Sequence, residues 1–126
     1  MKAACHKLLR STGGKLFFAE VGIEPSSAPS GQEISISATA FEPQEDIKYY
    51  PEWVAAAKRG VRYALTHAVP MPTSGISLRV TKILGTLVDT SEDAVAAAAC
   101  LATWDALEVS GSHPPRFEAG KIVFET

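Results

Sequence analysis

Seven basic side chains fall in two short segments where they could contact phosphate groups. Residues 1–15 contain four of them and no acidic residue. The other three are Lys58, Arg59 and Arg62, which lie opposite the apolar stripe of an expected helix. Lysine and arginine hold nucleic acids mainly through phosphate oxygens, so both segments are candidates for RNA binding. The basic residues of the first segment are Lys2, Lys7, Arg10 and Lys15.

The charge of the whole chain does not favour a strong RNA binder. The net charge is -2 and the isoelectric point is about 5.9, whereas nucleic-acid-binding domains usually carry a basic field. Residues 90–109 contain four acidic residues and no basic one, so the charge is unevenly distributed. The alternative interpretation is that the two basic segments are ordinary solvated faces.

Other kinds of chemistry find no support in the motifs. The Gly13-Gly14-Lys15 segment lacks the full spacing of a nucleotide-binding P-loop. The three histidines have neither metal-ligand spacing nor an obvious catalytic partner, and the two cysteines, Cys5 and Cys100, are too far apart for a CxxC pair. Asp89, Glu92 and Asp93 are explained more simply by the start of a helix. We therefore expect no catalytic residue, metal, cofactor or bound nucleotide.

Length and composition predict one globular domain over residues 1–126. Hydrophobic residues make up 46% of the 126-residue chain and charged residues 21%, which is ordinary for a folded soluble protein. No apolar run approaches the ~20 residues needed to span a bilayer, and residues 1–7 lack the apolar middle of a secretory signal. These features predict a cytoplasmic protein that does not enter membranes.

Alternation and turn residues predict the strands. A hairpin is expected around Gly13-Gly14, with residues 16–23 as its second strand, because aromatic and β-branched residues favour a pleated surface. Residues 24–31 contain two prolines and a glycine and predict a loop. Further strands are expected at residues 33–38, 76–81 and 121–124, and a second loop at 110–115.

Two helices are expected between these strands. The first begins near Pro51 and runs to about Ala68, and Gly60 within it predicts the close approach of another backbone. The second begins near Thr90, which we expect to cap it with Asp93 returning the hydrogen bond. Its small apolar residues would let the two helices lie close together. The order is β-β-β-α-β-α-β, which predicts an α+β fold with both helices on one face of a mixed sheet.

Three segments together carry a resemblance to a known family. Residues 53–65 show an aromatic residue, a run of alanines, a basic residue before glycine, and an alanine shortly after it. Residues 78–95 contain Leu-Arg-Val-Thr, a glycine, and then Val-Asp-Thr-Ser-Glu-Asp-Ala. Residues 10–15 and 23–25 supply a Gly-Gly-Lys hairpin and Ile-Glu-Pro. In this order and spacing the chain resembles domain IV of elongation factor G, which also occurs in elongation factor 2 and the tetracycline ribosomal protection proteins.

The resemblance implies a ribosomal protein S5 domain 2-like fold with a left-handed β-α-β crossover. It implies a stand-alone copy of the domain, without the GTPase, that contacts a ribosome or structured RNA. By matched position, the contacts would come from the hairpin at residues 11–15, with Thr12, Gly13 and Gly14 beside the basic residues, and from the loop at 85–91. Two departures from the family pattern fall on these loops: no Gly-Gln follows Lys15, and the second loop is shorter and lacks the family's histidine.

Other functions remain open at this level. A domain can keep its fold and lose its site. The main alternative is a protein-interaction module, or a homo-oligomer formed through exposed strand edges, because unpaired edges invite pairing. An enzyme is a third class, since related folds carry enzymes, but no motif in the chain supports it.

Overall fold

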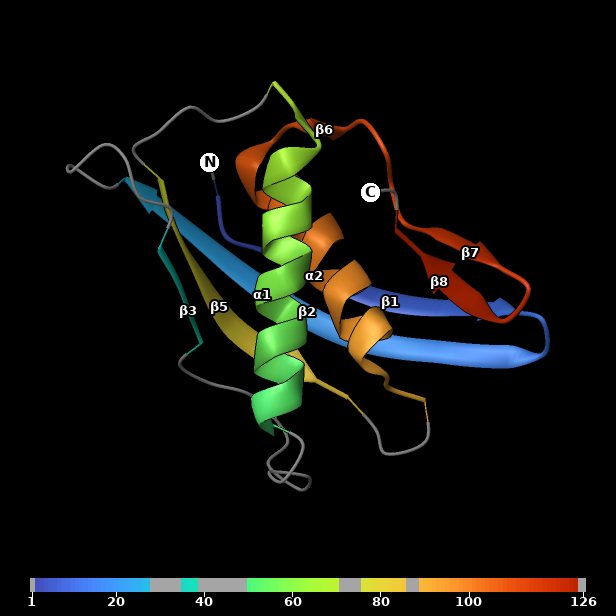
Figure 1. Ribbon diagram of the computed structural model, residues 1–126. Helices are drawn as coiled ribbons and strands as arrows, with labels where there is room; N and C mark the ends of the chain where they lie inside the picture. Colours follow the sequence, from blue (N-terminus) through green and yellow to red (C-terminus); the bar gives the residue numbers. More distant parts are fainter. Residues whose placement is uncertain (1, 28–34, 39–49, 71–75, 86–88, 125–126) are drawn as a thin grey trace.

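The computed structural model describes residues 2–27, 35–38, 50–70, 76–85 and 89–124, and shows an α+β fold (Figure 1). Within these ranges, two helices and eight strands follow one another along the chain. Their bounds are β1 Ala4–Thr12, β2 Lys15–Ser27, β3 Ser35–Ala38, α1 Tyr50–Thr66, β4 Ala68–Val69, β5 Ile76–Leu84, α2 Glu92–Leu107, β6 Ser110–Gly111, β7 Arg116–Glu118 and β8 Lys121–Val123.

The main sheet has four strands in the order β1-β2-β5-β3. The β1–β2 and β2–β5 pairs are antiparallel, while β3 runs parallel to β5, so the sheet is mixed as predicted. A register shift between Gly22 and Ile23 marks a bulge in the pairing of β2 with β5. Two small antiparallel pairs, β4–β6 and β7–β8, lie outside this sheet.

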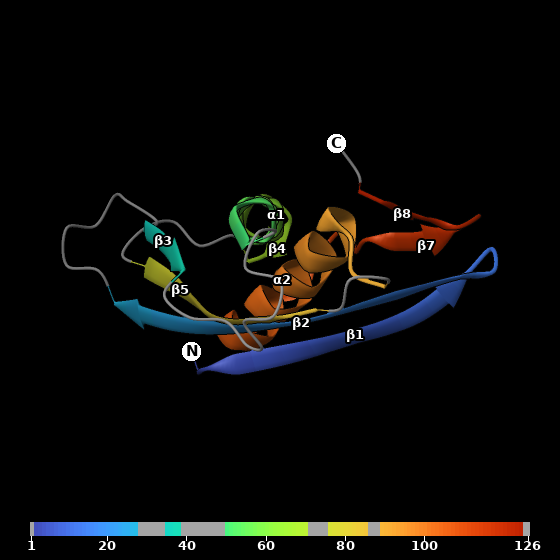
Figure 2. The ribbon, with the colours of Figure 1, turned by 90° about the horizontal axis from the view of Figure 1, so that it is seen from below.

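Both helices cover the same face of the main sheet (Figure 2), which confirms the predicted layering. The buried side chains recur at every second position along β2 and at Leu78 and Val80 of β5, because successive side chains of a strand point to opposite faces. The inward set is Leu8, Phe17, Ala19, Val21, Ile23, Leu78, Val80 and Ile83, none of which is more than 3% exposed. Helix α2 packs against α1, β1 and β2, so it is buried on most of its circumference.

The two helices meet at a glycine. An ideal Cβ atom built on Gly60 of α1 would lie 2.1 Å from the carbonyl oxygen of Ala96 in α2. No side chain fits there, which confirms that Gly60 marks a close backbone approach. The alanines of α2 are fully buried on this side, since small side chains allow two helices to lie close together.

Trp104 joins the two helices near their C-terminal ends. Its indole nitrogen donates a hydrogen bond of 2.8 Å to the carbonyl oxygen of Ala64 in α1. Its ring occupies the space where a side chain at Gly111 would lie. The pairing of β4 with β6 then closes this end, because Ala68 lies opposite Gly111 in the register.

Several predicted boundaries are wrong. Strand β2 does not end at Ile23 but continues to Ser27, within the segment predicted as a loop. Pro25 is tolerated there because β1 pairs with β2 only as far as Ile23, which leaves that side of β2 without a ladder partner from β1. The rest of the predicted loop, residues 28–31, and the start of the strand predicted at 33–38 lie outside the described residues.

The helix ends also differ from the prediction. Helix α1 stops at Thr66, and Ala68 belongs to β4 rather than to the helix. Ser91, not Thr90, caps α2 by accepting a 3.1 Å hydrogen bond from the backbone N–H of Ala94. The Thr90 hydroxyl instead donates to the carbonyl oxygen of Phe18 at 2.7 Å. A tertiary partner therefore decides between two adjacent hydroxyl groups.

Strands β4, β6 and β7 were not predicted, and β6 occupies the start of the segment predicted as a loop at residues 110–115. They contain only two or three residues each, too few for alternation to reveal them. The predicted last strand is present as β8, but it pairs with β7 rather than joining the main sheet.

Candidate nucleic-acid interface

The β1–β2 hairpin carries the first candidate residues past the ends of the helices (Figures 1 and 2). Its turn consists of Gly13 and Gly14, with φ values of +56° and +76°. Positive φ at both central residues is what a type I′ turn requires, and glycine adopts it without steric cost. The register sets Thr12 opposite Lys15 and Arg10 opposite Phe17. The predicted hairpin is therefore confirmed, and five of the candidate residues lie together at its end.

A second hairpin, β7–β8, lies against the first on the side that the helices occupy (Figure 2). Its turn residues, Ala119 and Gly120, also have positive φ values, of 52° and 76°. The two turns touch through their backbones, because an ideal Cβ atom on Gly13 would lie 2.4 Å from the backbone nitrogen of Gly120. We call residues 10–15 and 116–121 together the two-hairpin tip.

Two cations of the tip lie over aromatic rings. The guanidinium of Arg10 is 4.5 Å from the centre of the Phe117 ring, and the ammonium of Lys15 is 5.2 Å from the centre of the Phe17 ring. Both basic side chains are exposed, and within the described part of the chain neither forms an ion pair. Cation–π contact orients a charged group while leaving its hydrogen-bond donors available. The arrangement suits a phosphate oxygen.

Further charges reach the same tip from the second hairpin. Arg116 and Lys121 are exposed basic residues there, and Glu118 is the acidic one. The sequence predicted strand β8 but not its partner β7, and neither Arg116 nor Lys121 was among the candidate residues. The sequence offers only a weak signal for the hairpin, the glycine of Ala119-Gly120 between two segments of three residues each.

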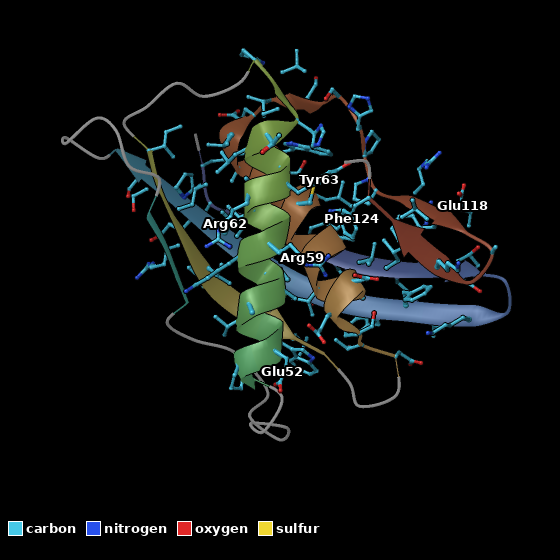
Figure 3. The ribbon with its side chains drawn as sticks, viewed as in Figure 1. Glu52, Arg59, Arg62, Tyr63, Glu118 and Phe124 are labelled. Carbon is cyan, nitrogen blue, oxygen red and sulfur yellow. The ribbon has the colours of Figure 1, made fainter. Side chains whose placement is uncertain are left out.

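The basic residues of α1 are not brought to the tip. Arg59 points towards α2 and Phe124, whereas Arg62 lies on the opposite side of the helix, towards β5 (Figure 3). The Arg59 guanidinium forms an ion pair of 2.9 Å with Asp93 and lies 5.5 Å from the centre of the Phe124 ring. Lys58 is half-buried. The candidate residues therefore divide into a hairpin group and a separate helix group.

The loop at residues 85–91, which was the other candidate for RNA contact, is anchored to the β1–β2 hairpin. The backbone N–H of Phe18 donates a 2.9 Å hydrogen bond to the carbonyl oxygen of Asp89, and the Thr90 hydroxyl donates to the carbonyl oxygen of Phe18. These bonds fasten the start of α2 to β2 close to Lys15. Residues 86–88 of this loop lie outside the described residues.

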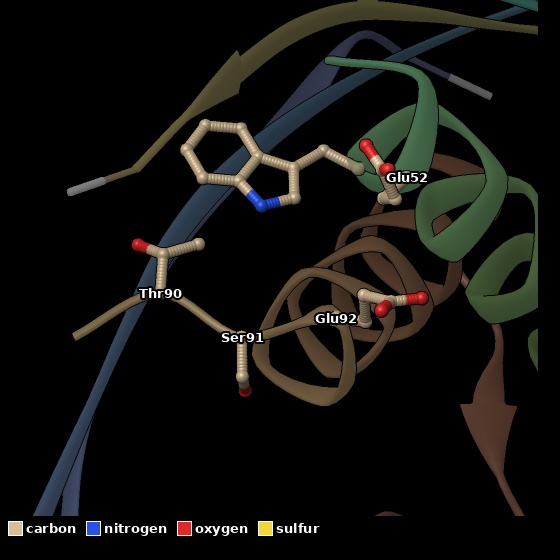
Figure 4. Close-up of a pocket in the computed structure, with 5 residues that line it drawn as sticks. Glu52, Thr90, Ser91 and Glu92 are labelled. Carbon is tan, nitrogen blue, oxygen red and sulfur yellow. The ribbon is translucent and has the colours of Figure 1, made fainter. Parts of the chain in front are cut away.

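A pocket opens where the two helices begin (Figure 4). It is lined by Trp53, Thr90 and Ser91, and by the carboxylates Glu52 and Glu92 from the first turns of α1 and α2. Two negative charges would repel a phosphate, so this pocket does not extend the candidate interface.

The open face of the sheet holds a shallow depression in which charges compensate one another. Glu20 accepts hydrogen bonds from the Cys5 thiol at 3.2 Å and from the Lys82 ammonium at 3.1 Å, and Arg79 pairs with Glu24. Partial burial, followed by the bond to Glu20, raises the pKa of the Cys5 thiol. The hydrogen bonds from Cys5 and Lys82 lower the pKa of Glu20.

Within the described ranges, no three metal-ligating side chains gather in a way that would hold a metal ion. The closest approach to a histidine pair is His67 and His113, whose ring centres are 5.2 Å apart beside Tyr63. The Tyr63 hydroxyl donates to the carbonyl oxygen of His113 at 2.6 Å, so these rings pack the β6–β7 connection onto α1. No described helix is long and apolar enough to cross a bilayer.

Comparison with known proteins gives the fold alone. No protein-family model and no curated protein matches the sequence. Among 52 similar chains of solved structures is a protein from Thermus thermophilus, described as ttk003000868. It superposes with a TM-score of 0.62 and 23% sequence identity over 86% of this chain. This chain spans only 16% of the Thermus protein's length, so the same fold forms one part of a longer protein there.

Proposed function

We propose that this chain is a non-enzymatic module related to domain IV of elongation factor G, and that it binds the ribosome or a structured RNA through the two-hairpin tip. The observation that carries the proposal is the pair Arg10 and Lys15, exposed at the end of a projecting hairpin and each held over an aromatic ring. Such cations are placed to contact phosphates that a flat basic surface would not reach. Work on ribosomes would place the protein in the cytoplasm.

The fold supports the same proposal. The parallel neighbours β3 and β5 are joined through α1, so they form the β-α-β unit to which the left-handed crossover of the S5 domain 2-like fold would apply. The three segments that resemble the family lie in α1, in β5 with the start of α2, and in the β1–β2 hairpin. The hydrogen bonds at Phe18 hold Asp89 and Thr90, from the loop at residues 85–91, against the β1–β2 hairpin.

Co-sedimentation with purified ribosomes over a series of salt concentrations tests the proposal. We expect binding that weakens steeply with salt, because each neutralised phosphate releases counterions. The variant Arg10→Ala/Lys15→Ala should lose most of this binding and lower the slope of log affinity against log salt by about 0.7–0.9 for each contact removed. The matched control Lys58→Ala/Arg62→Ala removes the same charge from α1 and should bind like the natural chain. Absence of binding at low salt would sink the proposal.

A second candidate function rests on the open face of the sheet. Leu9 and Leu16 are 57% and 42% exposed there, on β1 and β2, and β1 is an outer strand of the main sheet. Exposed leucines on an outer strand of the sheet favour contact with another protein or a second copy. Sedimentation velocity at rising protein concentration would reveal self-association, which Leu9→Lys should abolish.

A further inference from the structure

The β7–β8 hairpin has an apolar inner face and a charged outer face. Phe117 and Ile122 lie opposite each other in the register and face inward, where Ile122 is only 6% exposed. Arg116, Glu118 and Lys121 occupy the other face and are exposed, and Glu118 projects outward in Figure 3. The inner face of this hairpin is therefore apolar and packs on the core, whereas its outer face carries two basic residues and one acidic residue, with Glu118 opposite Lys121 in the register.

Phe117 links this hairpin to the proposed RNA contact. Its ring supports the Arg10 guanidinium at 4.5 Å, although the two residues belong to opposite ends of the chain. A stacked guanidinium keeps its planar set of N–H donors at the rim, where they match the oxygens of a phosphate. A long exposed arginine without such support would lose more side-chain entropy when it binds.

The contact between the turns fixes the relative position of the two hairpins. With Gly13 against Gly120, backbone to backbone, neither turn can move towards the other. The ends of both hairpins thus lie together at one end of the molecule, beyond the helices (Figure 1).

We infer that β7–β8 is the second half of the RNA-binding tip. Phe117 is a positioning residue that holds Arg10 ready for one phosphate, and Lys121 with Arg116 contacts a further phosphate of the same RNA backbone. The ligand class is the phosphodiester backbone of a structured RNA. This inference rests on the proposed function and extends it to a segment outside the residues that carry the family resemblance.

A double-mutant cycle tests the positioning role of Phe117, with ribosome affinity measured by sedimentation at fixed low salt. Phe117→Leu keeps an apolar side chain but removes the ring. We expect it to weaken binding roughly two- to fivefold, the range of a cation–π contact at an exposed site. In the Arg10→Ala background the same change should have almost no effect, and Phe117→Tyr should bind like the natural chain. An equal loss in both backgrounds would show that Phe117 serves only the fold.

The variants Lys121→Ala and Arg116→Ala test the second contact. Both residues are exposed, so thermal unfolding should confirm that the variants remain folded. We expect each to lower the salt slope by about 0.7–0.9 if its side chain meets a phosphate. Unchanged slopes for both, together with loss of binding in Arg10→Ala/Lys15→Ala, would overturn the inference and leave the proposed function standing. If the natural chain does not bind ribosomes at all, the proposed function and this inference both fail.

Discussion

Gly60 and Ala96 lie in direct backbone contact where α1 crosses α2. The carbonyl oxygen of Ala96 occupies the position that a side chain on Gly60 would need, 2.1 Å from an ideal Cβ atom. The spacing of the two helices is therefore set by the absence of one methyl group. Because α2 also packs on β1 and β2, this contact fixes α1 relative to the whole sheet.

Gly60→Ala should destabilise the protein although alanine is the better helix former. The gain in helix propensity is about 1 kcal/mol, but forcing the helices apart should cost more, so we expect a net loss of about 1–2 kcal/mol in the free energy of unfolding. Urea unfolding of the variant and the natural chain measures this difference in free energy. Ala55→Gly, at an exposed position of the same helix, is the control and should cost about 1 kcal/mol through propensity alone. A variant as stable as the natural chain would contradict the close contact.

Gly13→Ala and Gly14→Ala form a matched pair in one turn. Both residues have positive φ, so each substitution carries a backbone cost of about 1–2 kcal/mol. Only Gly13 faces another backbone, since no atom lies within 4 Å of the ideal Cβ position on Gly14. We expect Gly13→Ala to be clearly the less stable variant in urea and to weaken ribosome binding more. Equal behaviour of the two would mean that the turns do not touch in solution.

The two thiols should differ in reactivity for electrostatic reasons. Burial raises the pKa of Cys100 to about 12, so it should react with a thiol reagent only after unfolding. Cys5 is exposed, but its raised pKa leaves less thiolate near neutral pH, and labelling should be slower than for a free cysteine. Glu20→Gln removes the charge that helps raise this pKa and should accelerate labelling of Cys5. No change in the rate would contradict the role of Glu20.

Glu20 should also contribute to stability in a pH-dependent way. Its folded pKa lies below the ordinary value of 4.5, so its contribution is complete above the unfolded pKa and is lost as pH falls through the folded pKa. Glu20→Gln should therefore lower the free energy of unfolding by roughly 1–2 kcal/mol at neutral pH, as expected for hydrogen bonds to a charged group. The variant and the natural chain should converge as the solution is made strongly acidic. Urea titrations at several pH values measure the difference in free energy of unfolding between the two proteins. A difference that does not change with pH would contradict the role of the Glu20 charge.

The sequence predicts the parts of the fold that follow from local pattern. Gly60 was informative because glycine inside an apolar helix needs a reason, and Gly13-Gly14 because type I′ turns select glycine. Tertiary partners decided the rest. Thr90 was predicted to cap α2, but its hydroxyl donates to the carbonyl oxygen of Phe18 and Ser91 caps the helix instead. Pro25 suggested a loop, since the sequence does not reveal where β1 stops pairing.

The candidate site was predictable to a similar extent. Arg10 and Lys15 could be found from charge and turn chemistry, and they lie together. The ring beneath Arg10 could not, because Phe117 lies far along the chain in a three-residue strand. The sequence could not show that Lys58, Arg59 and Arg62 lie away from the hairpin. Helical spacing places residues on one face of a helix but does not say which element lies next to that helix.

The position of α2 has a consequence for how the chain folds during its synthesis. The β1–β2 hairpin is made early, and an isolated two-stranded hairpin is at best marginally stable in water. Its apolar inner side chains, such as Phe17 and Val21, are covered by α2, whose residues are added some seventy to ninety positions later. The nascent hairpin therefore stays uncovered until α2 has left the exit tunnel, and folding is a late, cooperative event that joins segments far apart in the chain.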